Sequence, residues 1–456
     1  MTINILSKDS RVFRFTPSID EDQKKISRIV ASIKRSAFTK DCFAFVHTLE
    51  GDDGWKIFNK AKEYERMGLN LNDKTCKFRY YSNKNYKTCA TYPELLVVAR
   101  EVKDEDIINS SNFRTKQRFP ALTYYHKKNG ASIWRSSQPR EGLWGSINKG
   151  DQTLIASIVK TAGNITKKFN CIDKDNAKLH IIDPRPKMNA IGNKVMGSGY
   201  ENTDNYESTW IHFCDIENIH KMRESYLKLT ELCSSESKLK SERWLSYLDG
   251  TDWLLHLHYI IGGMNMILSS IRSGRAVLIH CSDGWDRTSQ LSALAQLVLD
   301  EYYRTIIGFE MLIEKDFVMF GHQFCKRLGH GVQGYSTEAS PVFIQFLDCV
   351  HQLLIQFPTL FEFNDTFLCD IASHIYSQRF GTFLMDCERE RTASSLHKRT
   401  VSLWTFLNTS KERYINPLYD PKDDYILPNS SILNLSLWEE YHLMWTPFKR
   451  TLNTPM

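Results

Sequence analysis

The stretch from residue 276 to residue 303 limits the folds open to this chain more than any other. Residues 276–279 form a short apolar run, the polar segment HCSDGWDRT follows at 280–288, and a helical pattern occupies 289–303. This order predicts a buried strand, a tight loop and a helix. Backbone N–H groups at the start of a helix converge on one point, and the helix dipole adds positive charge there. The segment therefore predicts a binding site for an oxyanion.

Side chains within this loop suggest phosphate chemistry. Cys281 and Arg287 are separated by five residues. A cysteine thiolate is a competent nucleophile near a helix N-terminus, and a guanidinium matches the shape and charge of a phosphoryl group. Thr288 can donate its hydroxyl to the thiolate. A free cysteine after a strand is often only a core residue, but a core role does not account for two aspartates and an arginine in one short loop.

Two carboxyl groups compete for the role of the acid that protonates the leaving group. Asp286 lies inside the loop and can act if burial and the neighbouring phosphate raise its pKa. Asp283 is the alternative. His280, at the strand end, is expected only to help orient the loop.

The string HCSDGWDRT resembles the signature of the myotubularin family of phosphoinositide phosphatases. Further stretches resemble that family in the same order, over about 400 residues. They are GW at 54–55, YERMGL at 64–69, TYPELLVV at 91–98, FR at 113–114, RFPAL at 118–122, RSSQP at 135–139, DPRP at 183–186, NAIGNK at 189–194, DIENIHKMRES at 215–225, YYRTI at 302–306, FGH at 320–322, GHG at 329–331, SPVF at 340–343, FEFN at 361–364 and TVSLW at 400–404.

The resemblance implies a cysteine-based lipid phosphatase that needs no metal or cofactor. It would remove the 3-phosphate from phosphatidylinositol 3-phosphate and from phosphatidylinositol 3,5-bisphosphate through a phosphocysteine. By motif, Cys281 is the nucleophile, Asp286 the acid and Arg287 the phosphate clamp. The residues implied to bind substrate are Ser282, Asp283, Gly284, Trp285, Thr288, Asn193, Asn218 and Arg327.

Two positions depart from the family pattern. Gln323 follows FGH, where relatives carry Arg or Lys that reaches a second phosphate, whereas Arg327 is retained. Loss of one charge-assisted contact should weaken binding of a bisphosphate by roughly 1–3 kcal/mol. We therefore expect a shift of preference toward the monophosphate. Glu217 replaces a His found in many relatives and places a negative charge near the pocket or in solvent.

Alternating helical and strand patterns predict an α/β fold of the cysteine-dependent phosphatase kind, with a central, mainly parallel sheet and helices on both faces. Residues 43–450 are expected to form this domain, followed by a tail at 451–456. Residues 1–42 resemble the end of a PH-GRAM domain, with a strand at 11–15 and a helix at 21–35. Because so small a piece cannot form its own core, it should pack on the catalytic domain. We also predict a helix at 252–272 and an exposed, charge-rich loop at 388–399.

Composition bears on location and partners. The net charge of +6 over 456 residues is modest and dispersed, which suits an anionic membrane surface better than nucleic acid. Eleven cysteines show no disulfide or zinc spacing, which favours a reducing compartment. We see neither a signal peptide nor a spanning helix, since the apolar stretch at 259–268 is interrupted by two glycines and an asparagine. We expect a cytoplasmic protein, peripheral at endosomal or other internal membranes. Oligomers with itself or with other myotubularins remain open.

Two other functions remain in competition with the lipid phosphatase. The loop chemistry also permits a tyrosine or dual-specificity protein phosphatase, although the extended motifs disfavour it. A weakly active scaffold that binds phosphoinositides is the second alternative. Inactive members of the family lose the loop Cys, Arg or Asp, whereas this chain keeps all three.

Overall fold

The computed structural model describes residues 3–16, 23–37, 42–163, 177–330, 336–421 and 425–446. Its centre is a five-stranded sheet in the order β5-β6-β9-β7-β8. The pairs β6–β9, β9–β7 and β7–β8 are parallel, and β5–β6 is antiparallel. The predicted α/β fold with a mainly parallel sheet is confirmed. The five strands are β5 (Ala121–His126), β6 (Ala131–Ser137), β7 (Leu179–Asp183), β8 (Thr209–Phe213) and β9 (Ala276–Cys281).

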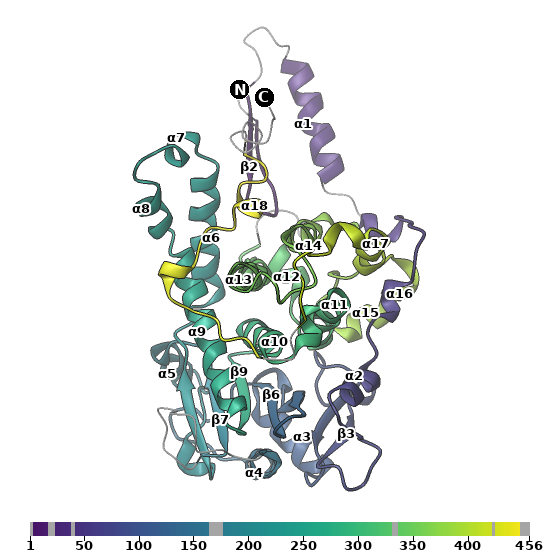
Figure 1. Ribbon diagram of the computed structural model, residues 1–456, viewed down its shortest axis with the longest axis vertical. Coiled ribbons are helices and arrows are strands. Elements are labelled where there is room, and N and C mark those ends of the chain that lie inside the picture. Colours follow the sequence, from purple (N-terminus) through teal and green to yellow (C-terminus); the bar gives the residue numbers. More distant parts are fainter. Residues whose placement is uncertain are drawn as a thin grey trace.

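Helices cover both faces of this sheet. The helices α9 (Trp253–Arg272) and α10 (Arg287–Leu299) pack on one face, and α4 (Lys149–Thr161) contacts β9 from the other (Figure 1). Every residue of β9 is buried, as expected for a central parallel strand covered on both sides. The predicted strand and helix around the loop are therefore confirmed, with α10 beginning at Arg287 instead of at residue 289.

The predicted helix at 252–272 is α9, whose apolar residues belong to the core. By length and composition alone α9 is the one helix among the described residues that could cross a membrane, but 56% of that window is buried inside the protein. Leu257, Ile260, Met264 and Ile267 are fully buried. The packing of α9 against α10 and the sheet accounts for its hydrophobicity.

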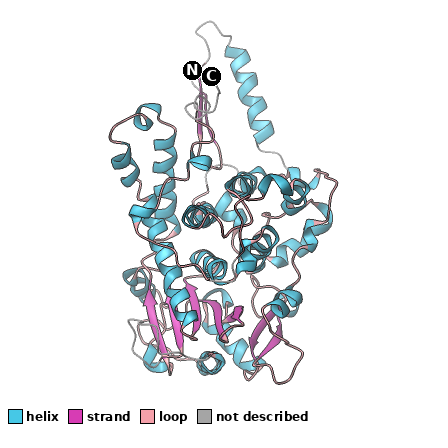
Figure 2. Cartoon of the chain, viewed as in Figure 1, coloured by secondary structure: helices cyan, strands magenta, loops and turns pink. Residues whose placement is uncertain are grey.

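Further helices lie beyond α9 and α10, on the side away from the sheet (Figure 1). Figure 2 shows the five-stranded sheet at one end of the molecule and the β1–β2 hairpin near the opposite end, with most helices between them. The remaining strands are β1 (Ile3–Leu6), β2 (Val12–Phe15), β3 (Phe78–Ser82) and β4 (Leu95–Ala99). The remaining α-helices are α1 (Gln23–Ala37), α2 (Lys60–Arg66), α3 (Asp104–Phe113), α5 (Lys187–Val195), α6 (Ile219–Cys233), α7 (Glu236–Leu239), α8 (Trp244–Asp249), α11 (Ile306–Ile313), α12 (Phe324–Leu328), α13 (Val342–Gln356), α14 (Asp365–Ser377), α15 (Glu388–Ala393), α16 (Leu396–Arg399), α17 (Leu403–Thr409) and α18 (Glu439–His442).

The N-terminal segment forms a hairpin, β1–β2, followed by α1. It therefore has one strand more than the sequence pattern predicted. The segment contacts the rest of the chain: Ile5 and Ile33 line a cavity of about 580 Å³ together with Tyr226 and Leu328. The helix itself extends away from the body (Figure 1), and Ile29 is 42% exposed. The domain boundaries stay a prediction, and the expected tail at 451–456 lies outside the described residues.

The expectation of an exposed, charge-rich loop at 388–399 is right for the exposure of most of its residues and wrong for the loop. This segment contains α15 and α16, and Arg391 and Leu396 are buried. The Arg391 guanidinium donates a hydrogen bond to the Thr382 carbonyl at 2.6 Å. A charge-rich segment can thus be part of the fold when a long side chain reaches an internal carbonyl.

Candidate active site

The loop between β9 and α10 packs directly against the end of β6. Gly284 has φ +76°, and a Cβ built there would lie 2.1 Å from the Ser136 carbonyl oxygen. The Gly284 carbonyl accepts hydrogen bonds from Arg118 Nη2 at 3.0 Å and from Arg135 Nη2 at 3.2 Å. Only glycine fits this conformation and this approach, so the residue type at 284 holds the loop against the strand.

Cys281 lies at the end of β9 and is 3% exposed. Its Sγ accepts hydrogen bonds from the Gly284 backbone N–H at 3.3 Å and from the Thr288 hydroxyl at 3.4 Å. The contact expected for Thr288 is therefore present. Both donors are directed at the sulfur and orient it at the end of the strand, as a nucleophile at this position requires.

Arg287 is the first residue of α10, and its side chain contacts the segment that precedes α6. Its Nη1 donates to the carbonyl oxygens of Ile216 at 3.1 Å and Glu217 at 3.5 Å. These contacts hold the guanidinium beside the loop. Its role as phosphate clamp stays a prediction.

Asp286 is in an ion pair that the sequence did not predict. Its two oxygens accept hydrogen bonds from Arg327 Nε at 3.0 Å and Nη2 at 2.8 Å, and His322 Nδ1 lies 3.3 Å from Oδ1. Burial alone would raise the pKa of Asp286, but the contacts with Arg327 and His322 outweigh it and hold the pKa well below its usual range. Without a bound phosphate the pKa of Asp286 is thus lowered and not raised, and its role as the acid stays a prediction.

Asp283 behaves in the opposite way. Burial, followed by the negative charge of Asp286, raises the pKa of Asp283. Arg327, expected to bind substrate, is instead engaged by Asp286 and also donates to the Glu338 carbonyl at 3.1 Å. The pKa values of the two loop aspartates thus shift in opposite directions, because only Asp286 forms an ion pair with Arg327.

The remaining predicted binding residues divide into two groups. Asn193, on α5, reaches the loop and donates from Nδ2 to Ser282 Oγ at 3.5 Å, and Arg185 Nη1 approaches the same oxygen at 3.4 Å. Asn218 instead caps α6, where its Oδ1 accepts from the backbone N–H of Lys221. Trp285 is buried, and its carbonyl accepts from His322 Nδ1 at 2.7 Å. Substrate contacts of these residues stay predictions.

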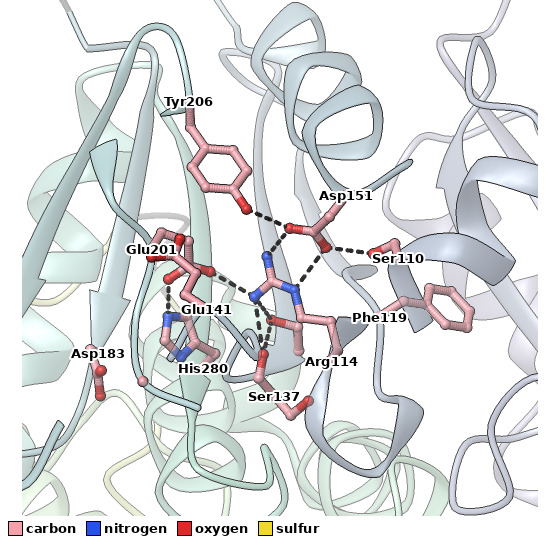
Figure 3. A network of polar contacts seen from close by, with 12 residues as sticks. Ser110, Arg114, Phe119, Ser137, Glu141, Asp151, Asp183, Glu201, Tyr206 and His280 are labelled. Atoms are coloured by element: carbon pink, nitrogen blue, oxygen red, sulfur yellow. Dashed lines mark hydrogen bonds and ion pairs between the residues drawn. The ribbon is translucent and has the colours of Figure 1, made fainter. Parts of the chain in front are cut away.

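A buried polar network lies under the loop, and most of it was not predicted from the sequence (Figure 3). The Arg114 guanidinium binds Asp151 at 2.7 Å, Glu201 at 2.6 Å and the Ser137 carbonyl at 3.0 Å. His280 Nε2 lies 2.6 Å from Glu201. Arg114 stands out in the sequence only as part of a motif, and nothing local marks Asp151 or Glu201 as its partners. The network ties the ends of β6 and β9 together immediately before Cys281.

One group of side chains among the described residues has ligand atoms close enough to hold a metal ion. These are His351, Asp365 and Glu440, whose ligand atoms lie within 4.8 Å of one another. They belong to α13, α14 and α18, and His351 Nδ1 is already 2.7 Å from Asp365 Oδ1. None of the three belongs to the catalytic loop.

Comparison with known proteins agrees with this geometry. The model of the myotubularin-like phosphatase domain matches residues 40–392. The myotubularins of Xenopus laevis and Rattus norvegicus are each 39% identical to this chain, over 98% and 100% of it and 72% and 74% of their own lengths. The phosphatidylinositol-3,5-bisphosphate 3-phosphatase MTMR2 of Mus musculus is 42% identical over 87% of this chain, which spans 60% of that relative. Since these matches cover the loop, the sheet and nearly the whole sequence, this chain belongs to the myotubularin family.

Proposed function

We propose that this protein is a phosphoinositide 3-phosphatase, acting on phosphatidylinositol 3-phosphate and on its 3,5-bisphosphate. The observation that carries the proposal is the Cys281 sulfur at the end of a buried strand, with two hydrogen-bond donors directed at it. A relative at 42% identity is named for the same reaction on the bisphosphate. Family and loop geometry together support a phosphoric monoester hydrolase.

In the proposed reaction, the Cys281 thiolate attacks the phosphorus of the 3-phosphate. The bond from phosphorus to the inositol oxygen breaks, and that oxygen takes a proton from a carboxylic acid of the loop. Water then gives a proton to the resulting carboxylate and attacks the phosphocysteine, whose bond from phosphorus to sulfur breaks. This step releases inorganic phosphate and restores both the thiolate and the carboxylic acid. Arg287 and the loop N–H groups would neutralise the charge of the transferring phosphoryl group.

The identity of the acid is open to a direct test. The pKa directions in this conformation of the loop favour Asp283, because Asp286 is held ionised by Arg327. Asp286 could serve only if substrate binding drew Arg327 away from it. Replacement of the true acid by Asn should slow hydrolysis of a lipid far more than that of an aryl phosphate, whose leaving group hardly needs a proton. Comparing Asp283→Asn with Asp286→Asn on both substrates assigns the role.

Gln323 supports a preference for the monophosphate. Its side chain is 4% exposed and donates to the Gly321 carbonyl at 3.0 Å. Because the amide is neutral, it supplies no positive charge to a second phosphate. We expect Gln323→Arg to raise turnover of the bisphosphate relative to the monophosphate. Equal turnover of both lipids by the unmodified protein, together with no effect of Gln323→Arg, would remove this idea.

The substrate implies a membrane. We place the protein in the cytoplasm, peripheral at endosomal or other internal membranes, where 3-phosphorylated lipids would be presented to the loop. Partner proteins, including other myotubularins, would be found by isolating the full chain from cells and measuring the mass of the complex.

The first experiment measures phosphate release from short-chain phosphatidylinositol 3-phosphate, its 3,5-bisphosphate and a phosphotyrosine peptide. The control is Cys281→Ser, whose hydroxyl is a poor nucleophile without an activating base. Release from the lipids alone, lost in Cys281→Ser, is the expected result. Release chiefly from the peptide would favour a protein phosphatase, and release from none of them would favour a scaffold that binds phosphoinositides.

A further inference from the structure

The helix α5, which carries Asn193, presents its apolar side to solvent. Met188, Ile191 and Val195 follow helical spacing and are 74%, 37% and 64% exposed, and Met196 just beyond them is 82% exposed. Ala190, on the opposite side, is fully buried. In a helix that only packs on a core, the apolar stripe faces inward. An apolar stripe that faces solvent is typical of a surface that contacts a partner or a membrane.

A second exposed apolar segment lies beside α5. In the loop that precedes α4, Leu143, Trp144 and Ile147 are 65%, 97% and 59% exposed. The Gly142 N–H donates to the Ser198 carbonyl at 3.0 Å, which joins this loop to the segment that follows α5. We call the exposed apolar residues of the 143–147 loop and of α5, with Met196, the apolar rim.

The apolar rim borders the catalytic loop on two sides. From α5, Asn193 Nδ2 reaches Ser282 Oγ at 3.5 Å. From the strand end that leads into the 143–147 loop, the Gln138 N–H donates to the Ser282 carbonyl at 3.3 Å. Ser282 directly follows Cys281 in the sequence. The two segments that carry the apolar rim therefore both contact the residue next to the catalytic cysteine.

Basic residues accompany the apolar rim. Arg140 and Lys149 flank the 143–147 loop, Lys187 begins α5, and all three are exposed. Lys116 is also exposed, and its charge acts on Asp283 in the catalytic loop. Exposed apolar side chains, including a tryptophan, surrounded by lysine and arginine have the chemistry of an element that lies in the interface of an anionic bilayer.

We propose that the apolar rim inserts into the interfacial region of the bilayer that holds the substrate, and thereby sets the catalytic loop over the lipid head group. This inference rests on the proposed function, because a membrane phosphoinositide is the reason for a bilayer at this place. Ser282 contacts Asn193 of α5 and Gln138 ahead of the 143–147 loop, so insertion of the rim would bring the catalytic loop to the bilayer surface.

The test compares Trp144→Asp and Met196→Asp with a matched control, Leu245→Asp. Leu245 is 76% exposed on α8, which lies well away from α5 (Figure 1). Binding is measured by co-sedimentation with vesicles of phosphatidylcholine and phosphatidylserine that contain no phosphoinositide. We expect each rim variant to bind about tenfold more weakly, as removal of one inserted apolar side chain implies. Leu245→Asp should bind as the unmodified protein does.

Activity separates this proposal from the proposed function. On short-chain phosphatidylinositol 3-phosphate in solution, rim variants should keep the activity of the unmodified protein, whereas on the same head group in vesicles they should lose most of it. Trp144→Phe should also remove part of the fluorescence quenching caused by brominated lipids. Unchanged vesicle binding by both rim variants would overturn the rim proposal alone. Absence of activity on any 3-phosphorylated lipid would instead overturn the proposed function.

Discussion

The buried polar groups under the catalytic loop, which we call the floor of the active site, differ from the apolar rim beside the loop in the kind of side chain that is buried. In the floor, Gly284, Arg114 and His280 are buried. The Gly284 carbonyl accepts from a guanidinium, and Arg114 and His280 contact a carbonyl and a carboxylate, so that the strand ends beneath Cys281 are fixed. The rim exposes apolar side chains such as Trp144, on a loop that turns through glycines at positive φ. Polar burial is thus concentrated where the geometry of the catalytic loop must be exact, whereas the neighbouring surface keeps its apolar area available for a partner.

The strongest test of this difference is Gly284→Ala. The added Cβ would meet the Ser136 carbonyl oxygen at 2.1 Å in a conformation with φ +76°. We expect a loss of about 3 kcal/mol or more in the free energy of unfolding and at least about a 100-fold fall in activity, because the loop must leave its seat. Denaturant unfolding and hydrolysis of an aryl phosphate measure both. Activity near that of the unmodified protein would show that the loop does not depend on this contact.

A second change tests the network rather than the loop. Glu201→Gln removes the charge that pairs with Arg114 and His280, and leaves a buried guanidinium with one carboxylate fewer. We expect a loss of about 3 kcal/mol in the free energy of unfolding and about a 10-fold fall in turnover of lipid and aryl phosphate alike. Exposed Glu207, changed to Gln, is the control.

The pH dependence of Glu201→Gln gives a further readout. His280 and Arg114 outweigh burial and hold the pKa of Glu201 well below its usual range. The stability that Glu201 contributes is therefore present at neutral pH and lost as pH falls below its unfolded value of 4.5. The destabilisation caused by Glu201→Gln should shrink in acid. A cost that stays constant with pH would contradict the ionised network.

The sequence predicted the parts of the site that depend on local order. The apolar run before Cys281 and the donors Gly284 and Thr288 lie within a few residues of one another, so strand, loop and helix follow from neighbouring residues. The ionised state of Asp286 could not be predicted, because Arg327 follows 41 residues later and meets it only in the folded chain. The contact between Glu201 and His280, which are 79 residues apart, could not be predicted for the same reason.

The exposed rim was not predicted from the sequence either. Met188, Ile191 and Val195 have the spacing of an ordinary core stripe, and only the packing of Ala190 reveals that the stripe faces outward. A helical pattern shows which residues share a face, but it does not show which side of the helix the rest of the chain will cover.

Glu141 lies between the buried network and the 143–147 loop of the rim. Glu141→Gln should change the free energy of unfolding less than the two substitutions above. Burial raises the pKa of Glu141 to about 7, in spite of the hydrogen bond from the Asn202 N–H, so the folded protein holds a proton that the unfolded chain releases near 4.5. The free energy of unfolding therefore falls as pH rises between these values. Glu141→Gln should remove this fall and gain on the order of 1–2 kcal/mol over the unmodified protein above that range.

Denaturant unfolding of both proteins at about pH 5 and about pH 8 measures the Glu141 effect, because other titrating groups cancel in the difference. A difference that does not grow with pH would mean that the Glu141 carboxyl is already ionised in the folded state. The partner in that case would be Lys194, whose Nζ lies 3.7 Å from Glu141 Oε2.

The smallest effect is expected for Gly145→Ala, the rim counterpart of Gly284→Ala. Gly145 also has positive φ, +64°, but a Cβ there would meet no atom within 4 Å. Only the cost of the left-handed conformation remains, about 1 kcal/mol in the free energy of unfolding. Turnover of short-chain phosphatidylinositol 3-phosphate should not change, since Gly145 carries none of the contacts that seat the catalytic loop. A fall in turnover of this soluble lipid as large as that caused by Gly284→Ala would contradict the separation of the rim from the floor, because strain in the 143–147 loop would then reach the catalytic loop.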